Sequence, residues 1–90
     1  MQIIKDKDFL RQMKSLLAYI ALDKKSAASA FNSELEAKFS LLKSTPYTYR
    51  KSIYFEDESY RDLIFKGYTI IYKIENERIL ILEVFKWQAR

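Results

Sequence analysis

The chain has 90 residues, 49% hydrophobic and 31% charged, which is enough for one modest core and excludes a disordered chain. Sixteen Lys and Arg against twelve Asp and Glu give a formal charge of +4, which favours an acidic partner, either nucleic acid or protein. The absence of Cys and His excludes a disulfide framework and argues against a zinc site, so we expect no metal and no cofactor.

No apolar run approaches the ~20 residues that a membrane-spanning helix requires, and the first residues lack the apolar core of a signal peptide. We therefore expect one domain over residues 1–90, located in the cytoplasm and without membrane contact.

The chain begins with a short apolar segment, 1–5, which we expect to form an edge strand of the later sheet. A helix over about 7–22 follows, with Asp6 or Asp8 as its N-cap, where negative charge is favourable. Its apolar residues recur at spacings of three and four, which places them on one face of a helix: Phe9, Met13, Leu16, Leu17 and Ile20.

Polar residues at 23–26 link the first helix to a second one, which we expect over about 25–43 with Asp23 or Ser26 as its cap. Its apolar stripe has the same spacing: Ala28, Phe31, Leu35, Phe39 and Leu42. Pro46 ends this helix, because the residue before a proline avoids the α region. The short link predicts that the two helices form an antiparallel hairpin.

Residues 47–59 carry no regular period. The apolar run Ile53–Phe55 is compatible with a short strand, and the acidic residues at 56–58 indicate a solvated loop.

From residue 60 onward, β-branched and aromatic residues dominate, and they predict three antiparallel strands near 60–66, 68–75 and 78–86. Gly67 and Asn76 lie at the two breaks, where tight turns favour residues that tolerate a positive φ.

Side chains alternate between the two faces of each predicted strand. In the second strand, Tyr68, Ile70, Tyr72 and Ile74 share one face. In the third, Leu80, Leu82, Val84 and Lys86 alternate with Ile79, Ile81, Glu83 and Phe85. The pattern predicts an α+β fold in which the helical hairpin packs on an antiparallel sheet. The half-polar face would then look away from the helices, towards solvent or a partner.

The order of elements resembles the RelE/ParE superfamily, the toxins of bacterial type II toxin–antitoxin modules, over essentially the whole chain. The more specific segments are Tyr-Arg-Asp-Leu-Ile at 60–64 and Gly-Tyr-Thr-Ile-Ile-Tyr at 67–72, and they favour the ParE branch. The resemblance implies a toxin that is neutralised by a small acidic antitoxin, whose C-terminal segment wraps it. It also implies one of two activities: ParE-like members poison DNA gyrase without hydrolysis, whereas RelE-like members cut messenger RNA on the ribosome.

Metal-free RNA cleavage needs a base for the 2′-hydroxyl, an acid for the leaving oxygen and cations for the phosphate. The chain has no histidine, the side chain best suited to the first two tasks, and position 69 holds threonine where RNA-cutting relatives usually place arginine. A nuclease site would have to use other residues: Arg61, Lys73, Glu83, Lys86 and Arg90, with Tyr72 as a further candidate. We therefore favour an inhibitor without catalytic residues.

The same residues also have structural interpretations. Arg61 has acidic neighbours and suits an ion pair, Tyr68 and Tyr72 suit the core, and Glu83 suits a solvated position. A binding module or decayed toxin, kept for its antitoxin contact, is a further alternative, and growth arrest on expression would distinguish it from either toxin.

Two surfaces carry the expected contacts. We assign Lys86, Trp87 and Arg90 to the target, although Trp87, the only tryptophan, suits a cap on the core equally well. The antitoxin residues that we expect lie on the first helix: Arg11, Lys14 and Tyr19. An apolar groove beside the hairpin and a free sheet edge would suit the antitoxin's helix and strand.

Overall fold

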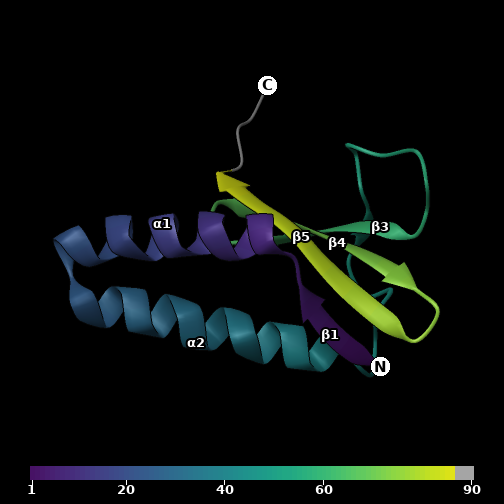
Figure 1. Cartoon of the computed structure of the whole chain (residues 1–90), viewed down its shortest axis with the longest axis horizontal. Helices are drawn as coiled ribbons and strands as arrows, with labels where there is room; N and C mark the ends of the chain where they lie inside the picture. The colour runs from purple at the N-terminus through teal and green to yellow at the C-terminus, as the bar shows by residue number, and fades with distance from the viewer. Residues whose placement is uncertain (87–90) are drawn as a thin grey trace.

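The computed structural model describes residues 1–86, in which a helical hairpin packs against one face of a five-stranded sheet (Figure 1). The elements are β1 (Gln2–Lys5), α1 (Lys7–Asp23), α2 (Lys25–Leu42), β2 (Arg50–Lys51), β3 (Tyr60–Phe65), β4 (Tyr68–Glu75) and β5 (Arg78–Lys86). The strand order is β1-β5-β4-β3-β2. The predicted α+β fold is confirmed, and each of the six predicted elements ends within one residue of its expected position.

The N-terminal strand makes the sheet mixed rather than wholly antiparallel. β1 pairs with β5 in the parallel direction, with Ile3 opposite Ile79 and Lys5 opposite Ile81, while the other three pairings are antiparallel. A hairpin turn cannot join parallel neighbours, and here the helices and three other strands lie between them in the chain.

The connection between the two helices is shorter than the sequence pattern indicates. Asp6 caps α1 as predicted, since its Oδ2 accepts a hydrogen bond from the Asp8 N–H at 2.9 Å. The predicted caps of the second helix are wrong: Asp23 still belongs to the last turn of α1, and Ser26 lies inside α2. A single extended residue, Lys24, joins the helices, and its N–H bonds back to the carbonyl of Ile20 at 3.2 Å.

The core lies between the hairpin and the helix-facing side of the sheet. The rings of Phe9 on α1 and Phe39 on α2 meet edge to face at 5.8 Å. Tyr72 on β4 is fully buried, and its hydroxyl donates to the carbonyl of Pro46 at 2.7 Å. Tyr68 is half-buried and packs against the same core, so the structural interpretation of both tyrosines is confirmed.

A bulge in β5 changes which of its side chains face the helices. Tyr72 lies opposite Ile81 but Ile71 lies opposite Glu83, so Leu82 is one extra residue in β5. Ile79 and Ile81 enter the core before the bulge and Val84 enters it afterwards. The predicted strict alternation along this strand is therefore wrong, because an extra residue shifts the period of two.

Both predicted turns use a positive φ. Lys66 and Gly67 join β3 to β4 with φ values of 50° and 84°, the combination that a two-residue type I′ hairpin requires. Asn76 has a φ of 51° in the turn before β5.

Between β2 and β3 the chain makes a loop, Ser52–Ser59, that we call the strap. The strand considered for Ile53–Phe55 is wrong, because side chains capture the backbone donors that a ladder would use. The N–H of Ile53 donates to Asp62 Oδ2 at 3.1 Å, and the N–H of Tyr54 donates to Ser52 Oγ at 3.1 Å.

The strap crosses the sheet face opposite the helices. The Tyr54 ring meets the Phe85 ring of β5 edge to face at 5.3 Å, and β4 lies between β3 and β5. Because the strap is bonded to Asp62 of β3 and reaches Phe85 of β5, it covers β4, where Thr69 and Ile71 are buried. Part of the half-polar face is thus covered by the chain itself rather than by solvent or a partner.

β5 continues to Lys86, beyond Ile81, the last residue that pairs with β1. The side chain of Gln12 on α1 lies beside this segment, where its Oε1 accepts a hydrogen bond from the Val84 N–H at 2.8 Å.

Candidate functional site

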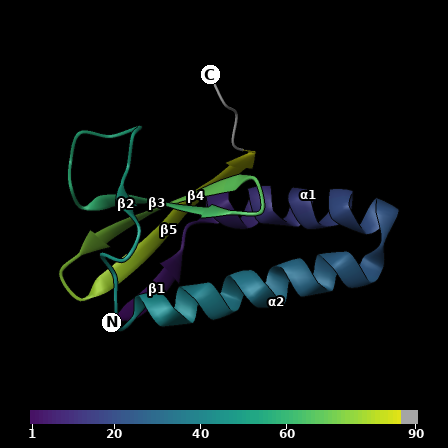
Figure 2. The same ribbon diagram turned by 180° about the vertical axis from the view of Figure 1, so that it is seen from behind.

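The tip of the helical hairpin projects beyond the sheet (Figures 1 and 2). Along the apolar stripe of α1, Phe9 and Met13 are buried, whereas Leu16, Leu17 and Ile20 are only half-buried. The stripe therefore continues past the sheet that covers its first two turns. Apolar surface at the tip is left for a partner to cover.

A hollow of about 580 Å³ opens at this tip, and we call it the tip hollow. It is lined by Tyr19, Ile20, Leu22 and Asp23. The exposed fraction is 67% for Tyr19 and 85% for Leu22, high values for such large apolar side chains. Exposed apolar side chains around a hollow are typical of a protein-binding site.

The three residues predicted to bind an antitoxin divide between two places on α1. Arg11 and Lys14 are exposed and three residues apart, so they are neighbours on the helix surface. Arg11 also pairs with Asp8 at 3.1 Å. Tyr19 lies about 7.5 Å further along the axis and in the tip hollow. The structure thus brings Arg11 and Lys14 together but not Tyr19.

A second hollow, of about 310 Å³, lies beside β1, the edge strand of the sheet. Lys5 of β1 and Glu36 of α2 line it and form an ion pair across it. Neither residue was singled out in the sequence, and no local signal links them, because they are separated by 31 positions and meet only in the fold. The free edge of β1 could accept an added strand here.

Two of the proposed nuclease residues lie on the helix-facing side of the sheet. Arg61 pairs with Tyr72 and Lys86 pairs with Tyr68, and paired residues share a face. Because Tyr68 and Tyr72 are four residues apart on β4, Arg61 and Lys86 are offset by about 13 Å along the strand direction, and they also lie on opposite sides of β4.

The other two described candidates point to the opposite face. Lys73 follows Tyr72 in β4 and so faces away from the helices, as does Glu83, which pairs with Ile71. The structure therefore does not bring the four described candidates to one place. The fifth, Arg90, lies outside the described residues.

Arg61 makes contacts that stabilise the fold. Its Nε donates to the carbonyl of Glu58 at 3.0 Å, and its guanidinium donates to the carbonyl of Tyr49 at 3.3 Å. The guanidinium also lies 4.8 Å from the centre of the Tyr47 ring. These contacts tie the segment before β3 to the sheet, so Arg61 stabilises the fold through backbone carbonyls and an aromatic ring rather than through the predicted ion pair.

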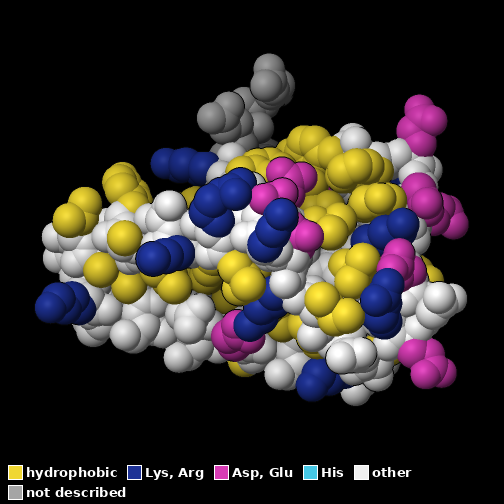
Figure 3. Space-filling model, viewed as in Figure 1, with side chains coloured by type: hydrophobic (Ala, Val, Ile, Leu, Met, Phe, Trp, Pro, Cys, Tyr) yellow, Lys and Arg dark blue, Asp and Glu magenta, His cyan; other side chains and the backbone are white. Residues whose placement is uncertain are grey.

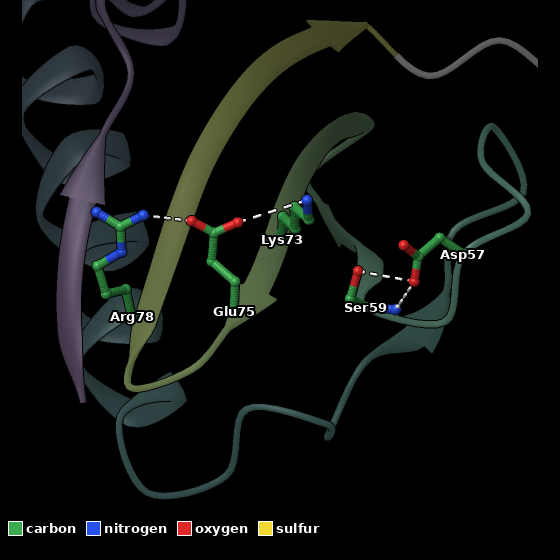
Figure 4. A network of polar contacts seen from close by, with 5 residues as sticks. All are labelled: Asp57, Ser59, Lys73, Glu75 and Arg78. Carbon is green, nitrogen blue, oxygen red and sulfur yellow. Dashed lines mark hydrogen bonds and ion pairs between the residues drawn. The ribbon is translucent and has the colours of Figure 1, made fainter.

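A chain of charges runs along the face opposite the helices (Figure 4). Glu75 pairs with Lys73 at 3.4 Å and with Arg78. The hydrogen bond from Arg78 holds the pKa of Glu75 below its ordinary value. The pKa of Lys73 is raised, mainly by its electrostatic interaction with Tyr60 and next by its hydrogen bond to Glu75. Both groups stay charged at neutral pH, whereas a general acid or base works best with a pKa near 7.

Figure 4 also shows Asp57, in the strap, where Oδ1 accepts hydrogen bonds from the N–H and the hydroxyl of Ser59, both at 2.8 Å. The bond from the Ser59 backbone is the main cause that lowers the pKa of Asp57. This carboxylate is fixed, exposed and charged.

The two remaining positions that a nuclease could use are buried. Thr69 is fully buried beneath the strap, so it presents no group to a substrate at the surface. Burial raises the pKa of Tyr72 to about 12, which keeps its phenol protonated at neutral pH.

Of the residues predicted to bind the target, Lys86 is exposed at the end of β5, while Trp87 and Arg90 lie outside the described residues. Within residues 1–86, no cluster of Asp, Glu, His or Cys has the geometry of a metal site. None of the helices in this part of the chain is long and apolar enough to cross a membrane.

Comparison with known proteins adds two findings. Residues 3–87 match the family described as "ParE toxin of type II toxin-antitoxin system, parDE". A solved structure titled "Chromosomal ParDE TA system from P. aeruginosa" superposes with a TM-score of 0.78 and 14% identity, covering 98% of this chain and 97% of that one. At this identity the likeness shows a common fold. No curated protein matches.

Proposed function

Because this chain belongs to the ParE toxin family of type II toxin–antitoxin systems, we propose that it inhibits DNA gyrase by protein–protein contact and is neutralised by a cognate antitoxin. The family match over residues 3–87 is the observation that carries this proposal. A RelE-like messenger RNA interferase acting on the ribosome is the second candidate.

Three observations favour inhibition by contact over RNA cleavage. The described nuclease candidates lie on two faces of the sheet, which separates them. Thr69 is buried where the RNA-cutting relatives usually carry a cation. Lys73 is held protonated by its neighbours, so it is a poor base. Loss of one charge-assisted contact to a transition state typically costs about 10²–10³ in rate.

The proposed target contact is the segment that contains Lys86, Trp87 and Arg90. A tryptophan supplies a large apolar anchor, and flanking cations complement an acidic surface on gyrase. An inhibitor of this kind needs affinity and complementary charge rather than a catalytic group.

We expect Trp87→Ala, and separately the pair Lys86→Glu with Arg90→Glu, to raise the toxin concentration that half-inhibits gyrase supercoiling by about tenfold or more. The pair Arg11→Glu with Lys14→Glu changes the net charge equally and serves as the control, which should inhibit as well as the unaltered protein. If the purified toxin instead cuts ribosome-bound messenger RNA and leaves gyrase untouched, the RelE-like candidate replaces this proposal.

For the antitoxin we propose the outer side of the hairpin. Arg11 and Lys14 form an exposed basic pair, and the tip hollow beside Tyr19 and Leu22 offers apolar surface close by. This combination suits an acidic amphipathic helix, which would lay its apolar side into the hollow.

The pair Arg11→Glu with Lys14→Glu should weaken antitoxin binding by about tenfold, measured by calorimetry at low salt, with a smaller loss at high salt because screening weakens exposed charges. Here the pair Lys86→Glu with Arg90→Glu is the control and should bind normally. Equal weakening by both pairs would show that net charge, rather than this helix face, determines antitoxin affinity.

A further inference from the structure

The strap exposes a concentration of large apolar side chains. The exposed fractions are 65% for Ile53, 45% for Tyr54 and 37% for Phe55, and Ile64 on the adjacent strand is 41% exposed. In Figure 3, hydrophobic side chains gather over the strands towards the strap, and acidic side chains stand at the margin beyond them. A contiguous apolar patch of this kind on a protein surface is typical of a binding site.

Acidic residues border this patch on one side. Glu56, Asp57 and Glu58 follow Phe55 directly and are all exposed, in a chain whose formal charge is +4. The run differs in sign from the basic pair on α1, so the two surfaces attract different partners. Three adjacent carboxylates also repel phosphates, which disfavours nucleic acid at this patch.

The strap is held in place before any partner binds. Asp62, itself 1% exposed, accepts hydrogen bonds from the Ile53 N–H at 3.1 Å and from Arg50 at 3.3 Å. The Phe55 ring stacks on the ring of Tyr60 at 4.1 Å. A preorganised loop loses little conformational freedom on binding, which favours affinity.

The patch also adjoins the segment already proposed to bind the target. The Tyr54 ring packs on Phe85, and Lys86 is the next residue of the chain. Apolar side chains therefore connect the acidic strap to the start of the basic C-terminal segment.

We propose that the strap is a second part of the target-binding surface and docks on an apolar protein patch bordered by Lys and Arg. This inference rests on the proposed inhibition by protein contact and adds the chemistry of the surface that is bound. The target would present basic groups to the strap and acidic groups to the C-terminal segment.

The test uses two substitutions that leave the strap anchored. Ile53→Lys places a charge in the apolar patch and keeps the backbone bond to Asp62, and Glu56→Lys reverses one charge at its border. Their matched controls are Leu41→Lys, at a residue 68% exposed on α2, and Glu77→Lys, at the exposed turn before β5. Each strap variant should need about tenfold more toxin for half-inhibition of gyrase supercoiling, and neither control should. Antitoxin affinity and melting temperature should stay unchanged in all four.

Several results would overturn the inference. Full inhibition by a folded Ile53→Lys variant would remove the strap from the contact, and a loss of antitoxin binding in this variant would assign the strap to the antitoxin. A gain of inhibition with Glu56→Lys would mean that the strap meets an anionic partner such as nucleic acid.

Growth arrest on induced expression separates this inference from the proposed function. If the unaltered protein leaves gyrase untouched but arrests growth, loss of arrest in the strap variants alone supports a docking strap, whereas arrest in every variant refutes it.

Discussion

Phe9→Ala is expected to lower the free energy of unfolding by about 3–5 kcal/mol, the usual cost of removing a buried aromatic ring. Phe9 is 2% exposed, and its ring packs edge to face against Phe39 on the other helix at 5.8 Å. A domain of this size has a total stability of roughly 5–13 kcal/mol, so the substitution removes a large part of it. Urea unfolding followed by circular dichroism measures the change as a lower midpoint with an unchanged slope.

Tyr19→Ala is the matched control, since it removes an aromatic ring from the same helix at a position that is 67% exposed. Because Tyr19 is exposed, this substitution should change the free energy of unfolding by no more than about 0.5 kcal/mol. Equal losses for Phe9→Ala and Tyr19→Ala would mean that the first turns of α1 do not pack on the sheet as the structure has them.

Alkaline pH should destabilise the protein through Tyr72. Burial raises the pKa of this phenol from 10.0 to about 12. Between these values the unfolded chain releases a proton that the folded chain retains, so the free energy of unfolding falls as the pH rises. The contribution is complete below pH 10, and the loss by pH 12 amounts to at most about 2–3 kcal/mol.

Tyr72→Phe isolates this effect because the lysines and other tyrosines titrate in both proteins. The variant loses the hydrogen bond to the Pro46 carbonyl, made at 2.7 Å, and should be less stable by about 1 kcal/mol at pH 7. From pH 10 upward the difference should shrink and then reverse, because only the unaltered protein has the buried phenol. Unfolding free energies that stay parallel from pH 7 to pH 12 would contradict a raised pKa.

The helices and the three long strands were predictable because their signals are local. The predicted apolar stripe of α2 is buried at every position: Ala28, Phe31, Leu35, Phe39 and Leu42. The bulge at Leu82 was not predictable, since it depends on how β5 fits against β4 rather than on the residues near it. The parallel direction of β1 likewise follows from the whole topology.

The candidate surfaces were less accessible to sequence reasoning. Exposure of Arg11, Lys14 and Tyr19 was foreseeable, but the tip hollow depends on where the sheet ends beneath the hairpin. The strap was missed because the run Ile53–Phe55 has the composition of a strand. The strand does not form because the Asp62 side chain, nine residues away in the sequence, accepts the hydrogen bond of the Ile53 N–H. The roles assigned to Trp87 and Arg90 stay predictions.

The contact between Gln12 and β5 bears on self-association. Beyond its last pairing with β1, β5 presents backbone groups that a strand of another molecule could pair with, and such edges promote aggregation. The Gln12 amide oxygen already occupies the Val84 N–H in the middle of this stretch, at 2.8 Å. A strand of a second molecule would have to displace the Gln12 side chain and would also have to fit beside α1. This glutamine thus caps one backbone donor of the exposed edge, which disfavours edge-to-edge pairing between copies of this chain.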